Sequence, residues 1–296
     1  MTSINRAEVI IEALPYIQSL AGKTVVIKYG GSAMINEELK ENVIKDIVLM
    51  QCVGINPVIV HGGGPHINEY LKKLGQEPTF IDGLRYTDKG TMDIVQMVLG
   101  GKVNKDLVTL IEKLGGKAIG ITGMDSAFIK AKKLEGPQDL GYVGEITSVD
   151  DTLLNNLIES KHIPVISSIA ISEDLEHSYN INADLCASKI ASSLKAEKLI
   201  LLTDVPGVLM DPKDKDSLIS SLRPHEIRKL KTDGILKKGM IPKIDCCVEA
   251  VRQGVKRTHI IDGTLPHSIL LEILSIEGIG TMIYWQFSVF KFQVSA

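Results

Sequence analysis

Two short segments rich in glycine each follow an apolar run of the chain. The sequence reads Lys-Tyr-Gly-Gly at 28–31 and His-Gly-Gly-Gly-Pro at 61–65. Glycines at a strand-to-helix turn leave backbone N–H groups uncovered, and the start of the following helix favours an anion. Because successive parallel strands end at the same edge of a sheet, two such loops would lie together there. The pair of loops predicts a phosphate-binding site, although glycines that only close a tight turn are the alternative for either loop alone.

Charged residues stand where such a site would need them. Lys28 ends an apolar strand beside the first glycine pair, and Lys243 directly follows a proline-containing turn. Either amine could neutralise a phosphate, and either could equally be a solvated surface lysine. Asp184 falls in the first turn of a predicted helix capped by Asn182, where the helix dipole alone also favours an acid. A buried run at 199–203 ends in a polar turn, which is typical of the edge of a nucleotide pocket but not specific to one.

Other catalytic patterns do not occur in the sequence. Residues 22–24 read Gly-Lys-Thr like the end of a phosphate loop, but Ile17 stands where that motif needs glycine, and a strand follows the segment rather than preceding it. There is no Gly-x-Gly-x-x-Gly, His-Glu-x-x-His or Gly-x-Ser-x-Gly motif, which argues against dinucleotide oxidoreductases, zinc hydrolases and serine hydrolases. His61 and His66 lack the partner set that a metal site or an activated nucleophile requires.

The composition of the chain excludes further classes of function. In 296 residues, 33 Lys and Arg oppose 36 Asp and Glu, so the net charge of −3 gives no electrostatic reason to bind nucleic acid. The 4 cysteines form no Cys-x-x-Cys pair, which favours reduced thiols over a zinc site or a disulfide framework. No uncharged apolar run reaches about 18 residues, so no membrane contact is predicted, and the N-terminus lacks signal-peptide features. We expect a cytoplasmic globular protein.

Hydrophobic periodicity predicts alternating strands and helices. We expect buried strands at 24–29, 57–61, 117–122, 163–170, 198–203 and 258–262, joined by helices into a mainly parallel sheet. Apolar residues recur at helical spacing from Met92 to Leu114, where Gly100 and Gly101 mark either a tolerated weak point or the close approach of another helix. Residues 128–134 and 142–146 predict an antiparallel excursion. A polar stretch at 174–179 is the best candidate for a boundary between two lobes.

The sequence resembles the amino acid kinase family, and within it the acetylglutamate kinase branch. Beyond the glycine loops it carries Gly-Leu-Arg-Tyr-Thr at 83–87, Asn-Ile-Asn-Ala-Asp at 180–184, Leu-Thr-Asp-Val-Pro-Gly at 202–207 and Gly-Met-Ile-Pro-Lys at 239–243, in the family's order. The resemblance implies an α/β fold, namely a three-layer αβα sandwich with a mainly parallel central sheet. An N-lobe at 21–178 would bind acetylglutamate and dimerise, and a C-lobe at 179–283 would bind ATP with Mg²⁺. The implied reaction transfers the γ-phosphoryl group of ATP to the side-chain carboxylate of N-acetyl-L-glutamate, the second step of arginine biosynthesis.

By motif position, the resemblance implies roles for individual residues. Lys28 and Lys243 would be the cations of the transition state, held by Asp184, while Gly31 and Gly63 would donate N–H groups to the transferring phosphoryl group. The acetylglutamate would be bound by Gly63, Gly64, Arg85 and Asn180. The nucleotide would be bound by Lys28, Gly30, Thr203, Asp204, Gly207 and Lys243. The Mg²⁺ would arrive with ATP, and no residue of the chain is expected to ligate a metal.

The ends of the chain point to regulation. Residues 8–20 predict an amphipathic helix, for which ordinary packing on the body is the alternative. In the resembled family, a leading helix such as 1–20 joins dimers into an arginine-inhibited hexamer, a trimer of dimers. The resemblance therefore implies an arginine site made of Tyr16, His267, Glu277 and Gly280. It also implies the cyanobacterial and plastid type, hence the plastid stroma as an alternative location and a PII-type signalling protein as a partner. The tail at 284–296 exceeds the usual family length and predicts an edge strand, a subunit contact or a disordered tail.

Two rival hypotheses stay open at this point. Another carboxylate or carbamate kinase of the same fold is one, and the motifs at 83–85 and 180–184 argue against it. A catalytically silent arginine-binding scaffold is the other, and it would require the loss of Lys28, Asp184 or Lys243, all of which are present.

Overall fold

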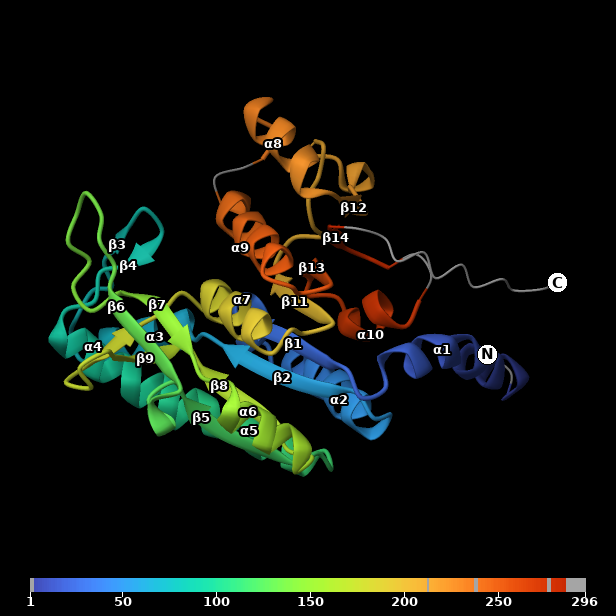
Figure 1. Ribbon diagram of the computed structural model, residues 1–296, viewed down its shortest axis with the longest axis horizontal. Helices are drawn as coiled ribbons and strands as arrows, with labels where there is room; N and C mark the ends of the chain where they lie inside the picture. The colour runs from blue at the N-terminus through green and yellow to red at the C-terminus, as the bar shows by residue number, and fades with distance from the viewer. Residues whose placement is uncertain (1–2, 212, 237–238, 276–277, 286–296) are drawn as a thin grey trace.

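An eight-stranded sheet runs through the computed structural model, which describes residues 3–211, 213–236, 239–275 and 278–285 (Figure 1). Its strand order is β12-β14-β13-β11-β1-β2-β8-β5, and every neighbouring pair is parallel except β13 with β14. The strands are β1 (Thr24–Tyr29), β2 (Asn56–His61), β5 (Ala118–Thr122), β8 (Ile163–Ser167), β11 (Lys198–Thr203), β12 (Ser221–Leu222), β13 (Arg257–Asp262) and β14 (Thr281–Tyr284). The predicted mainly parallel sheet is therefore confirmed.

Helices cover both faces of this sheet and make three layers. Residues of α2, α5 and α10 pack in the hydrophobic cluster on one face, and residues of α6, α7, α8 and α9 pack in the cluster on the other. These helices are α2 (Glu37–Cys52), α5 (Asn104–Lys113), α10 (Ser268–Ile273), α6 (Thr152–Glu159), α7 (Ala183–Ser193), α8 (Pro224–Thr232) and α9 (Met240–Arg252). The predicted αβα sandwich is confirmed. The β1–β11 ladder joins the two predicted lobes in one sheet, and their boundary stays a prediction.

A second, four-stranded sheet in the order β10-β9-β6-β7 lies over the α6 and α7 face. It contains β6 (Ile129–Lys133), β7 (Gly144–Val149), β9 (Ile169–Ser172) and β10 (Ser178–Asn180). The antiparallel pairing of β6 with β7 confirms the predicted excursion. The prediction of one strand at 163–170 is wrong, because the chain leaves the main sheet at Ser168. The Ser168 N–H donates to His61 O of β2 at 3.1 Å, and the next residue, Ile169, pairs with Asn180 of the second sheet.

The predicted helix at 92–114 consists of three helical segments. They are α4 (Lys89–Gln96), a π-helical stretch η2 (Met97–Val103) and α5. Both glycines lie in the π-helical stretch. A Cβ on Gly100 would lie 3.2 Å from Thr122 Cγ2 of β5, while a Cβ on Gly101 would meet nothing. Within the described chain, Gly100 therefore permits close packing on a strand, and the approach of a helix across a dimer stays a prediction.

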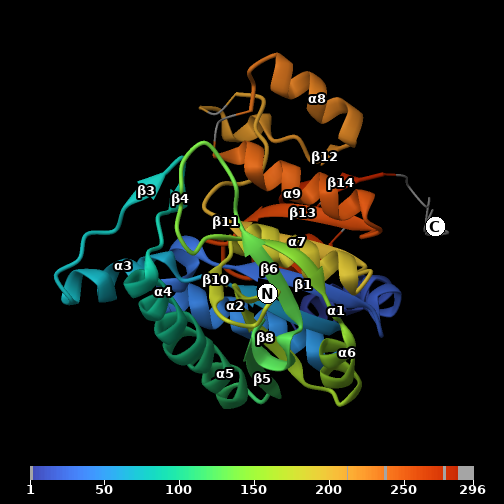
Figure 2. The same ribbon diagram turned by 60° about the vertical axis from the view of Figure 1, so that its left-hand side comes forward.

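Several smaller elements lie outside the two sheets and the helices that cover the main sheet. A hairpin of β3 (Phe80–Ile81) and β4 (Leu84–Arg85) projects at one end of the molecule, as Figures 1 and 2 both show. It follows α3 (Gly64–Lys73), which has Pro65 in its first turn as predicted. Single turns form η1 (Gly31–Met34), η3 (Asp125–Ala127) and η4 (Lys215–Ser217). At the other end of the chain, Trp285 is 59% exposed, and the rest of the predicted tail segment lies outside the described residues.

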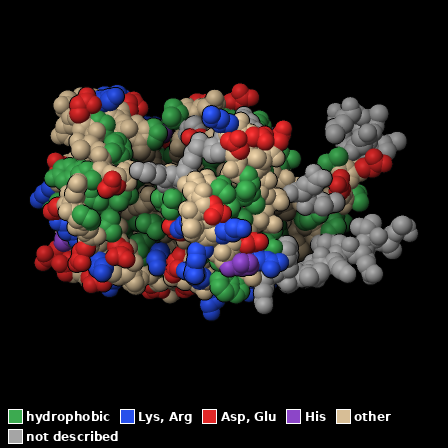
Figure 3. All heavy atoms as spheres, turned by 90° about the horizontal axis from the view of Figure 1, so that it is seen from above, with side chains coloured by type: hydrophobic (Ala, Val, Ile, Leu, Met, Phe, Trp, Pro, Cys, Tyr) green, Lys and Arg blue, Asp and Glu red, His purple; other side chains and the backbone are tan. Residues whose placement is uncertain are grey.

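The N-terminal helix α1 (Ser3–Leu20) is longer than the predicted helix at 8–20. Leu20 is buried in the core, but Val9, Ile10, Ile11 and Leu14 are exposed. Elsewhere on the surface, Lys and Arg side chains are interspersed with Asp and Glu on the face drawn in Figure 3. No helix in the described ranges is long and apolar enough to cross a membrane.

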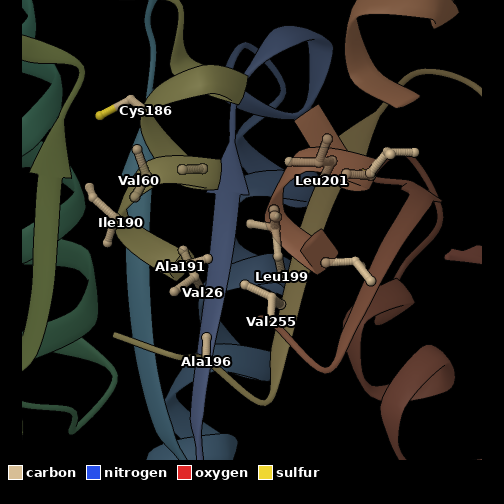
Figure 4. Close-up of a cluster of buried hydrophobic side chains, with 14 of the residues drawn as sticks. Val26, Val60, Cys186, Ile190, Ala191, Ala196, Leu199, Leu201 and Val255 are labelled. Carbon is tan, nitrogen blue, oxygen red and sulfur yellow. The ribbon is translucent and has the colours of Figure 1, made fainter. Parts of the chain in front are cut away.

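Alternation along the strands explains why two separate cores form. Val25 and Ile27 of β1 pack in the cluster shared with α2 and α5, whereas Val26 between them packs against α7. Figure 4 shows this second cluster, in which Val26 lies near Ala191 of α7. Because successive side chains of a strand point to opposite faces, a strand buried on both sides is apolar without interruption. Both faces of β1 are therefore packed up to its last residue, Tyr29.

Candidate active site

The two glycine loops lie side by side at the carboxyl edge of the main sheet. Lys28 of β1 is in register with Val60 of β2, and the Gly62 N–H donates to Tyr29 O at 3.2 Å. A Cβ on Gly30 would lie 3.0 Å from Lys28 Nζ, so glycine leaves room for the lysine amine to fold over the turn. Gly31 has a φ of 70°, a conformation that glycine adopts without strain. The predicted neighbourhood of the loops is confirmed.

A carboxylate holds two lysines at this edge. Asp184 Oδ1 lies 3.0 Å from Lys28 Nζ, and Asp184 Oδ2 lies 2.8 Å from Lys243 Nζ. Asp184 lies in the first turn of α7, where Asn182 accepts from the Asp184 and Leu185 N–H groups at 2.9 and 3.2 Å, and Lys243 lies in the first turn of α9. Burial would raise the pKa of Asp184, but the charges of Lys28 and Lys243 hold the pKa below its ordinary value. The carboxylate therefore stays ionised and fixes both ammonium groups.

Arg85 forms a second polar centre, next to the other glycine loop. It ends the β3–β4 hairpin, whose turn residues Asp82 and Gly83 have φ values of 48° and 83°. Its Nη2 donates to Gly64 O at 3.2 Å and to Asn68 Oδ1 at 2.6 Å, and burial lowers the pKa of the guanidinium. Its Nη1 is buried and has no hydrogen-bond partner among the described residues. An orphaned donor on a fixed guanidinium fits a carboxylate ligand.

Asn180 is tied to the Arg85 segment through Thr87. The Asn180 amide donates to Thr87 Oγ1 at 3.2 Å, and the Thr87 hydroxyl donates to Arg85 O at 2.9 Å. Thr87 is fully buried, and its backbone pairs with residues 140–142 of the excursion. The structure thus brings Asn180 and Arg85 together although they lie far apart in the sequence. Sequence reasoning included Thr87 in the motif at 83–87 without giving it a role, and it missed Asn68, which lies 17 residues before Arg85.

Apart from Lys243 on α9, the residues predicted to bind nucleotide lie at or just after the ends of β1 and β11, which are adjacent strands. Thr203 Oγ1 donates to Val205 O at 2.9 Å and accepts from its N–H at 3.0 Å, and Asp204 between them is exposed. Gly207 has a φ of 148°, and a Cβ there would lie 2.6 Å from Thr281 Oγ1. Glycine is therefore needed for this turn, and the role of these residues in nucleotide binding stays a prediction.

Comparison with known proteins identifies the family of this chain. Residues 23–262 match the amino acid kinase family. The chain belongs to this family. It is 64% identical over 279 residues to the acetylglutamate kinase of Clostridium beijerinckii, covering 94% of this chain and 98% of that protein. It is 55% identical over 283 residues to the acetylglutamate kinase of Syntrophomonas wolfei, covering 96% and 98%.

Solved structures of related proteins agree with this amino acid kinase fold. The N-acetylglutamate synthase of Neisseria gonorrhoeae, complexed with coenzyme A and N-acetyl-glutamate, is 25% identical with a TM-score of 0.83. That match covers 95% of this chain, which spans 64% of the synthase. The carbamate kinase of Giardia lamblia bound to AMP-PNP, at 20% identity and a TM-score of 0.66, covers 90% of this chain and 99% of that one and shares the fold.

Two of the residues predicted for an arginine site in this amino acid kinase, His267 and Gly280, form hydrogen bonds with two different acidic side chains. His267 Nδ1 lies 2.6 Å from Asp46 Oδ1 of α2, and the Gly280 N–H donates to Glu272 Oε2 at 2.9 Å. Tyr16 is half-buried on α1, and Glu277 lies outside the described residues. Sequence reasoning missed Glu272, a buried acid that also lies 2.5 Å from His259 Nδ1. The composition of an arginine site stays a prediction.

Proposed function

We propose that this chain transfers the γ-phosphoryl group of ATP to the side-chain carboxylate of N-acetyl-L-glutamate, giving N-acetyl-L-glutamyl 5-phosphate in arginine biosynthesis. The observation that carries the proposal is the Lys28–Asp184–Lys243 cluster beside two glycine loops. The high identity to acetylglutamate kinases over nearly the whole chain supports the choice of substrate. The motif assignments made from the sequence are the proposed residue roles.

The chemistry needs positioning and charge rather than a base. The substrate carboxylate is anionic at neutral pH, so its oxygen can attack the γ-phosphorus directly while the bond to the β,γ-bridging oxygen breaks and ADP leaves. Negative charge on the transferring group is neutralised by Lys28 and Lys243, and backbone N–H groups of Gly31 and Gly63 add donors. The orphaned Nη1 of Arg85 would bind the α-carboxylate of acetylglutamate, with Gly64 and Asn180 beside it.

The Mg²⁺ is proposed to enter with ATP as part of the substrate. Of the two acids assigned to the proposed site, Asp184 is already engaged by two lysines and is a poor additional metal ligand, and Asp204 is assigned to the nucleotide. Among the described residues, the cluster of His, Cys, Asp or Glu groups close enough to hold an ion is Asp174, Glu176 and His177, in the β9–β10 turn. The geometry of the candidate site therefore favours a metal held by the nucleotide's phosphates.

An acyl-phosphate trapping assay tests the proposed reaction. The purified chain is incubated with MgATP and hydroxylamine, and hydroxamate formation is measured with acetylglutamate, glutamate or aspartate as acceptor. We expect product with acetylglutamate alone. Product with glutamate or aspartate instead would keep the phosphoryl transfer and overturn the substrate. No product with any acceptor would overturn the proposed function in favour of a silent binding protein.

Replacing Arg85 with alanine should weaken substrate binding. Because the guanidinium would donate charged hydrogen bonds to the substrate, we expect Arg85→Ala to raise KM for acetylglutamate by about 10- to 100-fold, with a smaller effect on kcat. Steady-state kinetics at saturating ATP measure the effect, and Arg228→Ala on an exposed position of α8 is the control. An unchanged KM would remove Arg85 from the substrate site.

Arginine inhibition, the hexamer and the cyanobacterial or plastid type are proposed as finer properties of this kinase. The exposed apolar side chains of α1 support an oligomer, because a second copy could cover them. A PII-type signalling protein is the further proposed partner, and it rests on the sequence resemblance alone.

Removing α1 tests the oligomer and the inhibition together. Deletion of residues 1–18, which leaves the buried Leu20 in place, should abolish arginine inhibition and the hexamer while the kinase reaction continues. Light scattering and inhibition curves measure the two properties. The double substitution Ile10→Asp with Ile11→Asp, at exposed positions of α1, should act like the deletion. A deletion variant that is still hexameric and inhibited would contradict the proposed role of α1.

A further inference from the structure

Behind the second glycine loop lies a buried chain of hydrogen bonds that the reaction as described does not use. Asn104, the first residue of α5, and His61, the last residue of β2, are both fully buried. Asn104 Nδ2 lies 3.1 Å from His61 Nε2, and His61 Nδ1 lies 2.8 Å from Gly62 O. A Cβ on Gly120 of β5 would overlap Asn104 Oδ1, so glycine in that strand makes room for the amide.

The surrounding carbonyl groups determine where the protons lie in this series of hydrogen bonds. Asn104 Nδ2 also donates to Val165 O at 2.8 Å and to Ile121 O at 3.4 Å. Carbonyl oxygens only accept, so this atom of Asn104 is the NH₂ group, whose two hydrogens go to the nearer acceptors Val165 O and His61 Nε2, with the longer contact to Ile121 O sharing one of them. The imidazole proton is then on Nδ1, where it is donated to Gly62 O. Burial lowers the pKa of His61 to about 4, so the ring is neutral at physiological pH.

The hydrogen bond from His61 Nδ1 to Gly62 O fixes the direction of a backbone N–H group in the site. Gly62 O and the Gly63 N–H belong to one peptide unit, which is trans, so they point in opposite directions. Holding the oxygen against the His61 ring therefore turns the Gly63 N–H away from it. This N–H group has no acceptor among the described residues, and Gly62 lies against Ala183, the neighbour of Asp184.

We propose that Asn104 and His61 are positioning residues that orient the Gly63 N–H toward the transferring phosphoryl group. Asn104 selects the imidazole tautomer, His61 holds the Gly62–Gly63 peptide, and the peptide supplies the donor. The inference rests on the proposed kinase function. It also explains a histidine beside the phosphates that does not act as a base, because both of its nitrogens are committed to hydrogen bonds.

Substitution of His61 separates this role from simple packing. His61→Leu removes the donor to Gly62 O, and a misdirected N–H group should lower kcat by about 10- to 100-fold, with KM for acetylglutamate changed by less than about 3-fold. His61→Asn returns an amide N–H group near the position of Nδ1, so its kcat should recover to within about 5-fold of the wild type. Equal kcat values for the wild type and His61→Leu would overturn the proposal.

Substitution of Asn104 tests the first bond of the chain. Asn104→Ala removes the donor to His61 Nε2 and should lower kcat as His61→Leu does. Leu107→Ala removes another fully buried side chain of α5 without touching the chain of hydrogen bonds, so it should lower the melting temperature but leave kcat at 25 °C unchanged. If the two α5 variants lose kcat equally, Asn104 acts only through stability and the proposal fails.

The histidine tautomer can be read directly, whatever the activity. Nitrogen-15 spectra of the histidine-labelled full chain, with the His61 signals assigned by their loss in His61→Asn, should show a neutral ring protonated on Nδ1 from about pH 6 to pH 8. In Asn104→Ala, where Nε2 loses its donor and only Gly62 O still favours the Nδ1–H form, the share of the Nε2–H form should rise. A wild-type ring protonated on Nε2 would overturn the proposal even in an active enzyme, whereas an inactive wild type with the expected tautomer would instead refute the proposed reaction.

Discussion

We expect Lys28→Ala to lower kcat by about 1,000-fold, while KM for acetylglutamate changes by less than about 5-fold. The Lys28 ammonium lies 3.0 Å from Asp184 at the end of a strand buried on both faces, so it is held before the substrates arrive. A preorganised cation stabilises the charge that spreads over the phosphoryl oxygens in the transition state, and losing such a group typically costs 10² to 10⁵ in rate. Binding of the acceptor uses other groups and should be little affected.

The matched control for this substitution is Lys132→Ala. Lys132 belongs to β6 of the second sheet and forms an exposed ion pair with Glu145 at 3.7 Å. Such surface pairs contribute little to stability, so this variant should behave as the wild type. Hydroxamate formation under saturating substrates measures kcat for both variants. A Lys28→Ala enzyme with near-wild-type kcat would exclude Lys28 from the transition state.

The buried strands could be predicted because they are apolar on both faces. The predicted strands at 24–29 and 198–203 coincide with β1 and β11, where continuous burial leaves a sharp polar boundary at each end. The same apolar continuity concealed the break at Ser168. Residues 163–171 are buried throughout, and two buried serines at 167–168 are the only polar residues that mark the passage from one sheet to the other. Only long-range pairing determines that break.

The residues of the site also differ in whether a local sequence pattern predicts them or only long-range contacts place them. Lys28 and Asp184 follow from local patterns, because a strand end beside glycines and a helix first turn are visible in a few residues. Asn104 carries no such signal. Its amide contacts His61, 43 residues away, and Val165, 61 residues away, so its role depends on how three strands and α5 are brought together. A glycine between two isoleucines inside a strand, Gly120, was the one local hint of a close neighbour.

Asp184→Asn is expected to lower kcat by about 100- to 1,000-fold although Asp184 need not touch the substrates. The carboxylate forms ion pairs with two ammonium groups, whereas the asparagine amide offers one acceptor oxygen and turns an NH₂ group toward the second lysine. One lysine should therefore leave its position. Because neighbouring charges keep the pKa of Asp184 below its ordinary value, the wild-type carboxylate is ionised throughout the neutral range, and its loss should lower kcat without creating a new pH transition there.

The double variant shows whether Asp184 acts through the lysines. If the carboxylate only positions Lys28 and Lys243, removing Lys28 already forfeits most of its contribution, and Lys28→Ala with Asp184→Asn should lose about 10³- to 10⁴-fold in kcat. Independent contributions would multiply to about 10⁵- to 10⁶-fold instead. Asp106→Asn, at an exposed acid in the first turn of α5, is the control for the loss of one helix-terminal charge. Multiplicative losses in the double variant would mean that Asp184 contacts the reacting groups itself, for which its burial between two lysines leaves little room.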